Sequence, residues 1–123
     1  MDKPKIARVR GALGEVRAEQ EIVARGMRVL ARNVRCPGAE IDLIALDGGV
    51  IAFIEVKTRT GARAVAGRMA VTGEKQRRIC RGALAYMAQN GLMDRQARFD
   101  VIEIQDGRVT YIQNAFPYCG PAF

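Results

Sequence analysis

The sequence predicts one mixed α/β domain, in the order α-β-β-β-α-β-β, with a mixed central sheet flanked by helices. The length of 123 residues suits one domain with a hydrophobic core, and 49% of the residues are hydrophobic. Apolar residues recur at helical spacing in two segments, and five other segments are rich in β-branched residues. Turns that contain glycine separate several of these strands.

The first helix is predicted for Gly11–Arg25, after a basic lead-in of residues 1–10. Within this helix, Glu15, Ala18 and Ile22 are spaced i, i+3 and i+7, so they share one face. Because the other two members of this face are apolar, we expect the Glu15 carboxylate to lie beside the core.

The second helix is predicted for Glu74–Asn90, with Thr72 as its N-cap and Gly91 after its end. It follows a loop, Thr60–Gly73, that is rich in glycine, alanine and arginine. The side chains expected to face the core are Ile79, Cys80, Ala83, Leu84 and Met87.

Five strands complete the predicted fold, and the second and third of them, which follow a turn at Pro37-Gly38, carry the candidate site residues. The predicted strands are Met27–Arg35, Glu40–Leu46, Val50–Arg59, Arg98–Gln105 and Arg108–Gln113. Asp47, Gly48 and Gly49 separate the second strand from the third, and such a turn between two β-rich segments is a strong hairpin signal.

This hairpin predicts a charged patch on one side of the sheet. If Gly48–Gly49 is a two-residue loop, Asp42 lies opposite Glu55 and Glu40 lies opposite Lys57. Side chains alternate along a strand, so all four share one face, and directly opposed Cβ atoms are roughly 4.5–5.5 Å apart. A one-residue bulge would change this register.

Carboxylates facing each other beside an apolar strand repel, and a divalent cation would relieve that repulsion. Oxygen ligands of this kind suit Mg²⁺ or Mn²⁺, and Lys57 would then position a water or hold a phosphate oxygen. The alternative is a salt-bridged cross-strand pair without metal. Glu40 fits either a supporting acid of such a site or the ion-pair partner of Lys57.

The net charge is +7, and one segment carries the whole excess. Residues 57–81 hold eight bases and a single acid, whereas bases and acids balance in the remainder. This distribution predicts a polyanionic partner, with a basic face kept for solubility as the alternative. The candidate nucleic-acid contacts are Arg59, Arg63, Arg68, Lys75, Arg78 and Arg81.

Several classes of protein are disfavoured by composition. The chain has no histidine, which excludes a Ser-His-Asp triad and most zinc sites. No apolar run approaches the roughly 20 residues of a membrane span, and no secretory signal is expected. Cys36, Cys80 and Cys119 are odd in number and widely spaced, so we expect free thiols and a cytoplasmic location.

The spacing of Asp42, Glu55 and Lys57 resembles the PD-(D/E)xK motif of restriction-endonuclease-like nucleases, whose common core has a similar element order. Over about Gly11–Phe116 the chain also resembles the YraN-like family of endonuclease-related bacterial proteins. The motifs that carry this resemblance are Gly14-Glu15-x-x-Ala18, Arg32-Asn33, Glu40-Ile41-Asp42, Phe53-Ile54-Glu55-Val56-Lys57, Val71-Thr72-x-x-Lys75, Arg98-Phe99-Asp100-Val101 and Asn114-Ala115-Phe116.

The resemblance implies a restriction-endonuclease-like fold and Mg²⁺-dependent endonuclease activity on DNA, including branched or other non-standard structures. Asp42 and Glu55 would be metal ligands, Lys57 the catalytic lysine, and Glu15 an additional metal-binding acid from the first helix. Archaeal Holliday-junction resolvases are similar in having such a helix glutamate. Ile41 stands where the superfamily commonly has proline, which removes no catalytic group.

Two other functions fit the same residues. The domain can be a nucleic-acid-binding or interaction module on a nuclease scaffold with negligible turnover, because fold does not determine function. It can also be an accessory subunit whose site a partner or a second copy completes. A homodimer is compatible with cutting two strands, whereas no membrane partner is expected.

Overall fold

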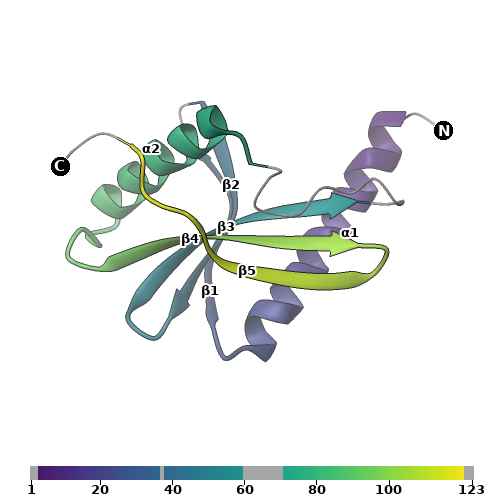
Figure 1. The fold of residues 1–123 in the computed structure, drawn as a ribbon, viewed down its shortest axis with the longest axis horizontal. Coiled ribbons are helices and arrows are strands. Elements are labelled where there is room, and N and C mark those ends of the chain that lie inside the picture. The colour runs from purple at the N-terminus through teal and green to yellow at the C-terminus, as the bar shows by residue number, and fades with distance from the viewer. Residues whose placement is uncertain (1–2, 37, 60–70, 121–123) are drawn as a thin grey trace.

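In the part of the chain that the structure describes, two helices and five strands follow one another in the predicted order (Figure 1). The computed structural model describes residues 3–36, 38–59 and 71–120, without the side chains of residues 3–12. The elements are α1 (Lys3–Ala24), β1 (Arg28–Cys36), β2 (Ala39–Asp47), β3 (Val50–Arg59), α2 (Gly73–Gln89), β4 (Gln96–Gln105) and β5 (Arg108–Phe116). The predicted α/β fold class is therefore confirmed.

The main correction concerns the start of α1, which begins at Lys3 rather than Gly11. The predicted lead-in of residues 1–10 is thus helical from its third residue onward. Pro4 falls in the first helical turn, where proline needs no backbone donor, so it does not oppose the helix. Gly11 costs about 1 kcal/mol within a helix, which is too little to end one.

The sheet has the order β1-β2-β3-β4-β5. The pair β3–β4 is parallel, and the other neighbouring pairs are antiparallel, so the sheet is mixed as predicted. α1 packs against one face and α2 against the other, which places β3 in the middle of a three-layer arrangement (Figure 1).

The side chains of β3 alternate between two cores. Ile51 and Phe53 pack in the core under α2, whereas Ala52 and Ile54 pack in the core under α1. All four are almost fully buried, and burial of a large apolar side chain contributes about 1.5–3 kcal/mol. Because Glu55 follows in the same alternation, its side chain is directed toward the α2 side of the sheet.

The predicted hairpin register is confirmed over the loop-proximal half of β2 and β3. The pairs run from Asp47–Val50 to Leu43–Ile54, and the pairing ends there. Beyond this point β2 pairs only with β1, and β3 pairs only with β4. The expected opposed pairs Asp42–Glu55 and Glu40–Lys57 are therefore not formed.

The end of the β2–β3 pairing coincides with an irregularity between β1 and β2. Arg32–Leu43 and Val34–Ile41 pair across these strands, but Asn33 between them adopts a φ of 50°. Asparagine tolerates this left-handed conformation better than most residues. Ile41 packs in the core under α2 and Leu43 in the core under α1, so the usual alternation of β2 is broken at Asp42.

A buried ion pair in β4 connects this strand to β5 and to the end of β2. Asp100 is 1% exposed, and its carboxylate accepts from Arg98 Nε at 2.9 Å, from Tyr111 Oη at 2.5 Å and from the Asn114 backbone N–H at 2.9 Å. Arg98 also reaches Asp47 at 3.0 Å. Burial and the neighbouring Asp100 charge raise the pKa of Tyr111, so its hydroxyl keeps the proton that it donates.

We expect Asp100→Asn to lower the free energy of unfolding by roughly 3 kcal/mol, because it leaves the buried Arg98 guanidinium with only the partly exposed Asp47 carboxylate as counter-charge. Urea denaturation measures this change. Asp94→Asn, at an exposed position, is the matched control and is expected to stay within about 0.5 kcal/mol of wild type. Equal stabilities for the two variants would contradict a structural role for the Asp100 ion pair.

Candidate functional site

Charged side chains from four elements meet where β2 and β3 separate. We call them the charged cluster: Glu15 of α1, Asp42 of β2, Glu55 and Lys57 of β3, and Lys75 of α2. The structure thus brings together the four residues predicted to be catalytic. It adds Lys75, which the sequence had suggested only as a nucleic-acid contact.

Asp42 is held by a backbone N–H of β3 beyond the point where the β2–β3 pairing ends. Its Oδ2 accepts from the Val56 N–H at 2.8 Å, so the carboxylate replaces a strand partner for this donor. Burial and the nearby negative charge of Glu55 raise the pKa of Asp42 to about 7, although the Val56 hydrogen bond opposes this rise. Within the described residues Asp42 forms no ion pair, so its charge is poorly compensated.

Glu55, in contrast, is bound by two ammonium groups. Its side chain is 6% exposed, and its Oε1 lies 2.5 Å from Lys75 Nζ and 3.1 Å from Lys57 Nζ. Lys75 lies in the first turn of α2, where the Thr72 hydroxyl accepts from its backbone N–H at 3.2 Å. The predicted N-cap is therefore confirmed, and it fixes the position of Lys75 above β3.

The two lysines differ in proton affinity. Burial and the neighbouring Lys75 lower the pKa of Lys57 below its usual value, against the attraction of Glu55. Burial also opposes the charge on Lys75, but its hydrogen bonds outweigh burial and raise the pKa of Lys75. Lys57 is therefore the more readily deprotonated member of the pair.

Close packing of α1 on β3 positions Glu15. A Cβ on Gly14 would clash with Thr58 Oγ1, so the close approach of the helix requires glycine at this position. Glu15 is half-buried, and its charge contributes to the raised pKa of Asp42. With its amide turned to donate, Asn33 places its nitrogen 3.1 Å from Glu15 Oε1, so the irregular residue of β1 orients the helix carboxylate.

The donors of the charged cluster match a hard divalent cation in chemical type. Mg²⁺ and Mn²⁺ take oxygen ligands, and Mg²⁺ commonly uses one or two carboxylates together with water. Asp42 and Glu55 provide such a pair. Among the residues that the structure describes, however, no group of three or more acidic, histidine or cysteine side chains has the geometry of a metal site.

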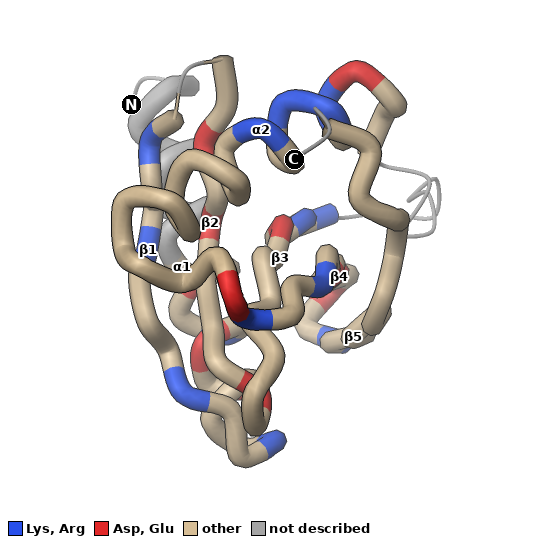
Figure 2. The backbone as a smooth tube through the Cα atoms, turned by 90° about the vertical axis from the view of Figure 1, so that its left-hand side faces the viewer, with Lys and Arg blue, Asp and Glu red and all other residues tan. Residues whose placement is uncertain are grey.

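The remaining candidate residues lie around the charged cluster or in the part of the chain that the structure does not describe. Glu40 is exposed, and Lys57 pairs with Glu55 instead of Glu40, because β2 and β3 have already separated. Figure 2 shows basic residues along α2, of which Lys75 enters the cluster, while Arg78 forms an ion pair with Glu74. The other candidates are Arg81, which is exposed, Arg59, which is half-buried at the end of β3, and Arg63 and Arg68, which lie outside the described residues.

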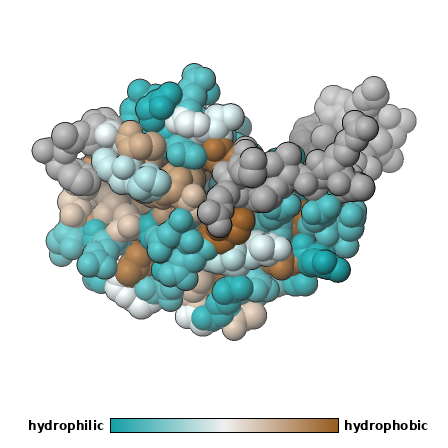
Figure 3. Space-filling view, viewed as in Figure 1, coloured by the Kyte–Doolittle hydropathy of each residue, from teal (hydrophilic) through white to brown (hydrophobic). Residues whose placement is uncertain are grey.

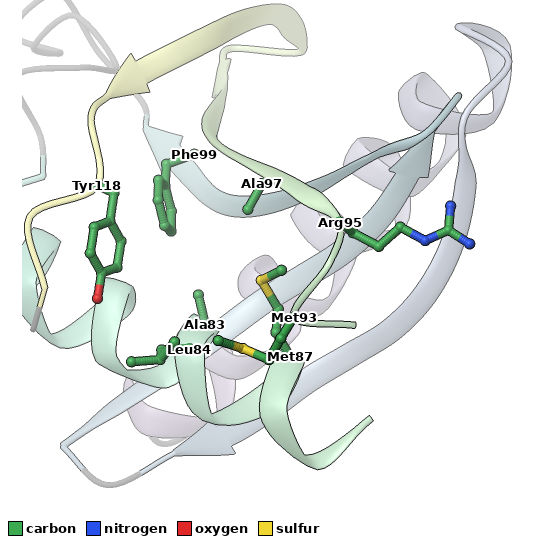
Figure 4. A pocket seen from close by; sticks show the side chains of 8 residues that line it. All are labelled: Ala83, Leu84, Met87, Met93, Arg95, Ala97, Phe99 and Tyr118. Carbon is green, nitrogen blue, oxygen red and sulfur yellow. The ribbon is translucent and has the colours of Figure 1, made fainter. Parts of the chain in front are cut away.

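A separate apolar pocket of about 300 Å³ lies between α2, β4 and the C-terminal segment (Figure 4). Met87, Phe99 and Tyr118 line it, and it includes no member of the charged cluster. The face of the molecule shown in Figure 3 is largely hydrophilic, with apolar patches between the hydrophilic areas. Among the described residues, neither helix combines the length and apolar character needed to cross a membrane.

Comparison with known proteins supports the resemblance to the YraN-like family. Residues 14–104 match the model of a family described as "Uncharacterised protein family UPF0102". The chain belongs to the UPF0102 family. It is 49% identical over 111 residues to a UPF0102 protein of Symbiobacterium thermophilum, covering 86% of this chain and 94% of that protein. It is 46% identical over 112 residues to one of Trichlorobacter lovleyi, covering 86% of this chain and 88% of that protein.

The UPF0102 match includes every member of the charged cluster. Sequence reasoning had named all five residues but had not predicted that Lys75 binds Glu55. The only signal was the motif Val71-Thr72-x-x-Lys75, in which the N-cap fixes the lysine in the first turn. The role of Asn33 beside Glu15 was also missed, because its signal is a backbone conformation.

We predict that Asp42 makes the stability of this UPF0102 protein fall as pH rises from about 4 to about 7. The folded protein binds the Asp42 proton more tightly than the unfolded chain does, so ionisation costs folding free energy in this window. Asp42→Asn removes the cost and should be more stable than wild type by roughly 4 kcal/mol at pH 8, and about equal at pH 4.

Urea denaturation in the presence of a chelator at a series of pH values measures this difference. The exposed Asp94→Asn variant serves as the control and should follow wild type at every pH. A constant difference between Asp42→Asn and wild type from pH 4 to pH 8 would show that Asp42 does not titrate near neutrality.

Proposed function

We propose that this protein is a metal-dependent endonuclease that hydrolyses phosphodiester bonds in DNA, including branched or other non-standard structures. The observation that carries this proposal is Asp42, a carboxylate with a pKa near 7 beside a second carboxylate, without an ion-pair partner among the described residues. Such an arrangement reduces stability. Charged groups in costly surroundings are concentrated at functional sites.

Asp42 and Glu55 would hold Mg²⁺ or Mn²⁺, with Glu15 as an additional acid. When bound, the ion would lower the pKa of a coordinated water and stabilise negative charge on the phosphate. For the ion to bind Glu55, the ammonium groups that pair with this carboxylate would have to move away from it. Lys75 is suited to this movement, because its side chain is 38% exposed and unbranched.

Lys57 would act on the reacting phosphate itself. Its ammonium lies on the same face of β3 as the Glu55 carboxylate and can donate to a phosphate oxygen on which charge develops. The lowered pKa of Lys57 also brings proton exchange with a nearby water closer to neutral pH. Arg78, Arg81 and Arg59 would contact backbone phosphates, as would Arg63 and Arg68, which remain predictions from sequence.

The second candidate is a nucleic-acid-binding module with negligible catalysis. Two observations favour it: Glu55 is already neutralised by Lys57 and Lys75, and no three-acid metal group is present among the described residues. The two functions differ in whether the folded protein binds a divalent ion. The homodimer and the accessory-subunit role stay predictions.

We expect Mg²⁺ or Mn²⁺ to raise the melting temperature of the wild-type protein, since a ligand at about 100 times its Kd adds roughly 2.7 kcal/mol to stability. Asp42→Asn should show a much smaller rise. The control is Asp94→Asn, which should respond like wild type. A wild-type melting temperature that is independent of both ions would favour the binding module.

Cleavage of duplex, flap and four-way DNA tests turnover directly. We expect Mg²⁺-dependent cleavage that falls by about 10²–10³-fold in Asp42→Asn and in Lys57→Ala. DNA binding should weaken with salt, with a slope of roughly −0.9 per phosphate contacted. If Asp42→Asn cuts as fast as wild type, the assigned mechanism is wrong.

Removal of the Lys75 ammonium should strengthen metal binding, because Lys75 neutralises the Glu55 carboxylate that the ion requires. We expect Lys75→Met to lower the Kd for Mn²⁺ by about tenfold, or 1.4 kcal/mol, in a calorimetric titration. Lys75→Arg keeps the charge and should resemble wild type, as should Arg77→Met on the exposed side of α2. An unchanged Kd in Lys75→Met would refute competition at Glu55.

A further inference from the structure

Two of the three cysteines lie together although 39 residues separate them in sequence. The sulfur atoms of Cys80 and Cys119 are 3.5 Å apart. The Cys119 backbone N–H also donates to Cys80 Sγ at 3.3 Å, which keeps the two residues facing each other. Both cysteines are free thiols, and Cys36 packs elsewhere, against Gly82 of α2.

The two thiols have different surroundings. Cys80 lies in α2 and is 0% exposed, and burial raises the pKa of its thiol to about 11. Cys119 is exposed in the segment after β5. Together with Arg77 and Arg81 it lines a hollow of about 140 Å³. Cys119 is therefore the member of the pair that a small oxidant can reach from solvent.

We propose that Cys80 and Cys119 form a redox-active thiol pair, in which a peroxide oxidises Cys119 and Cys80 then closes an intramolecular disulfide. Cys119 would be the attacking residue, because it is exposed and lines this hollow, whereas Cys80 is buried. Cys80 would be the resolving residue, protected from solvent until Cys119 has reacted. This site is independent of the charged cluster and of the proposed nuclease function.

The reaction balances with hydrogen peroxide as the oxidant. The Cys119 sulfur attacks one peroxide oxygen, the O–O bond breaks, and the products are a sulfenic acid on Cys119 and one water. The Cys80 sulfur then attacks the Cys119 sulfur, and the hydroxide that leaves takes the Cys80 proton to form a second water. Two thiols lose two electrons and two protons, and a dithiol reductant reverses the step.

The geometry requires only a small movement. A disulfide needs a sulfur–sulfur distance near 2.05 Å, so the sulfurs must approach by roughly 1.5 Å. Cys119 belongs to an irregular segment, whereas Cys80 is fixed in a helix, so the segment can supply the movement. This segment already presses on α2, because a Cβ on Gly120 would lie 3.1 Å from Cys80 Cβ. The disulfide would attach the segment covalently to α2.

The test is stoichiometric oxidation of the reduced full-length protein with hydrogen peroxide. We expect accessible thiols, counted after denaturation, to fall from three to one. The intact mass should decrease by two hydrogen atoms, and a peptide map should show a Cys80–Cys119 cross-link that dithiothreitol removes. Cys36→Ser is the control and should form the same cross-link at the same rate.

Two comparisons make the result decisive. Cys119→Ser should lose thiols at least tenfold more slowly than wild type, whereas Cys80→Ser should accumulate a sulfenic acid on Cys119 that dimedone traps. Wild-type protein unfolded in urea should form the cross-link at least tenfold more slowly, because only the fold brings the sulfurs together. An intermolecular disulfide, three thiols remaining, or equal rates in folded and unfolded protein would each overturn the proposal.

Discussion

The end of the β2–β3 pairing at Leu43–Ile54 is the constraint on which the candidate site depends. Beyond it the Val56 N–H has no strand partner, and the Asp42 carboxylate accepts it at 2.8 Å. Because β2 and β3 separate there, side chains from both helix layers can approach the second half of β3. Glu15 of α1 and Lys75 of α2 approach this region from opposite faces, since the two helices cover opposite sides of the sheet.

In two places in the sheet an aspartate carboxylate accepts a backbone N–H, but only one of the two aspartates has an ion-pair partner among the described residues. Asp42 accepts the N–H of Val56, and Asn33 lies beside Asp42 in the neighbouring strand. Asp100 accepts the N–H of Asn114. Both asparagines have a positive φ. Asp100 pairs with the Arg98 guanidinium, which also reaches Asp47. Asp42 forms no ion pair within the described residues and has a pKa near 7. One aspartate therefore completes the structure, and the other retains charge that a ligand can neutralise.

Local sequence signals predicted the hairpin register and the start of α2. The contacts of the charged cluster could not be predicted, because they depend on residues that are distant in sequence. The glycine turn at residues 48–49 set the hairpin register, and Thr72 marked the start of α2 correctly. The change of alternation at Asp42 could not be predicted, because it depends on the Asn33 backbone in a different strand. Likewise, the Lys75–Glu55 contact joins residues 20 positions apart that only the packing of α2 brings together.

The charges of the cluster give a reason why a phosphodiester would suit the proposed site. With every group ionised, three carboxylates and two ammonium groups leave one net negative charge, which repels a phosphate. A divalent cation would change the net charge to one positive, equal and opposite to that of one phosphodiester. The two lysines on Glu55 thus prevent an excess of negative charge when the site is empty. The cluster would become neutral only with both ion and phosphate bound, so each would favour binding of the other.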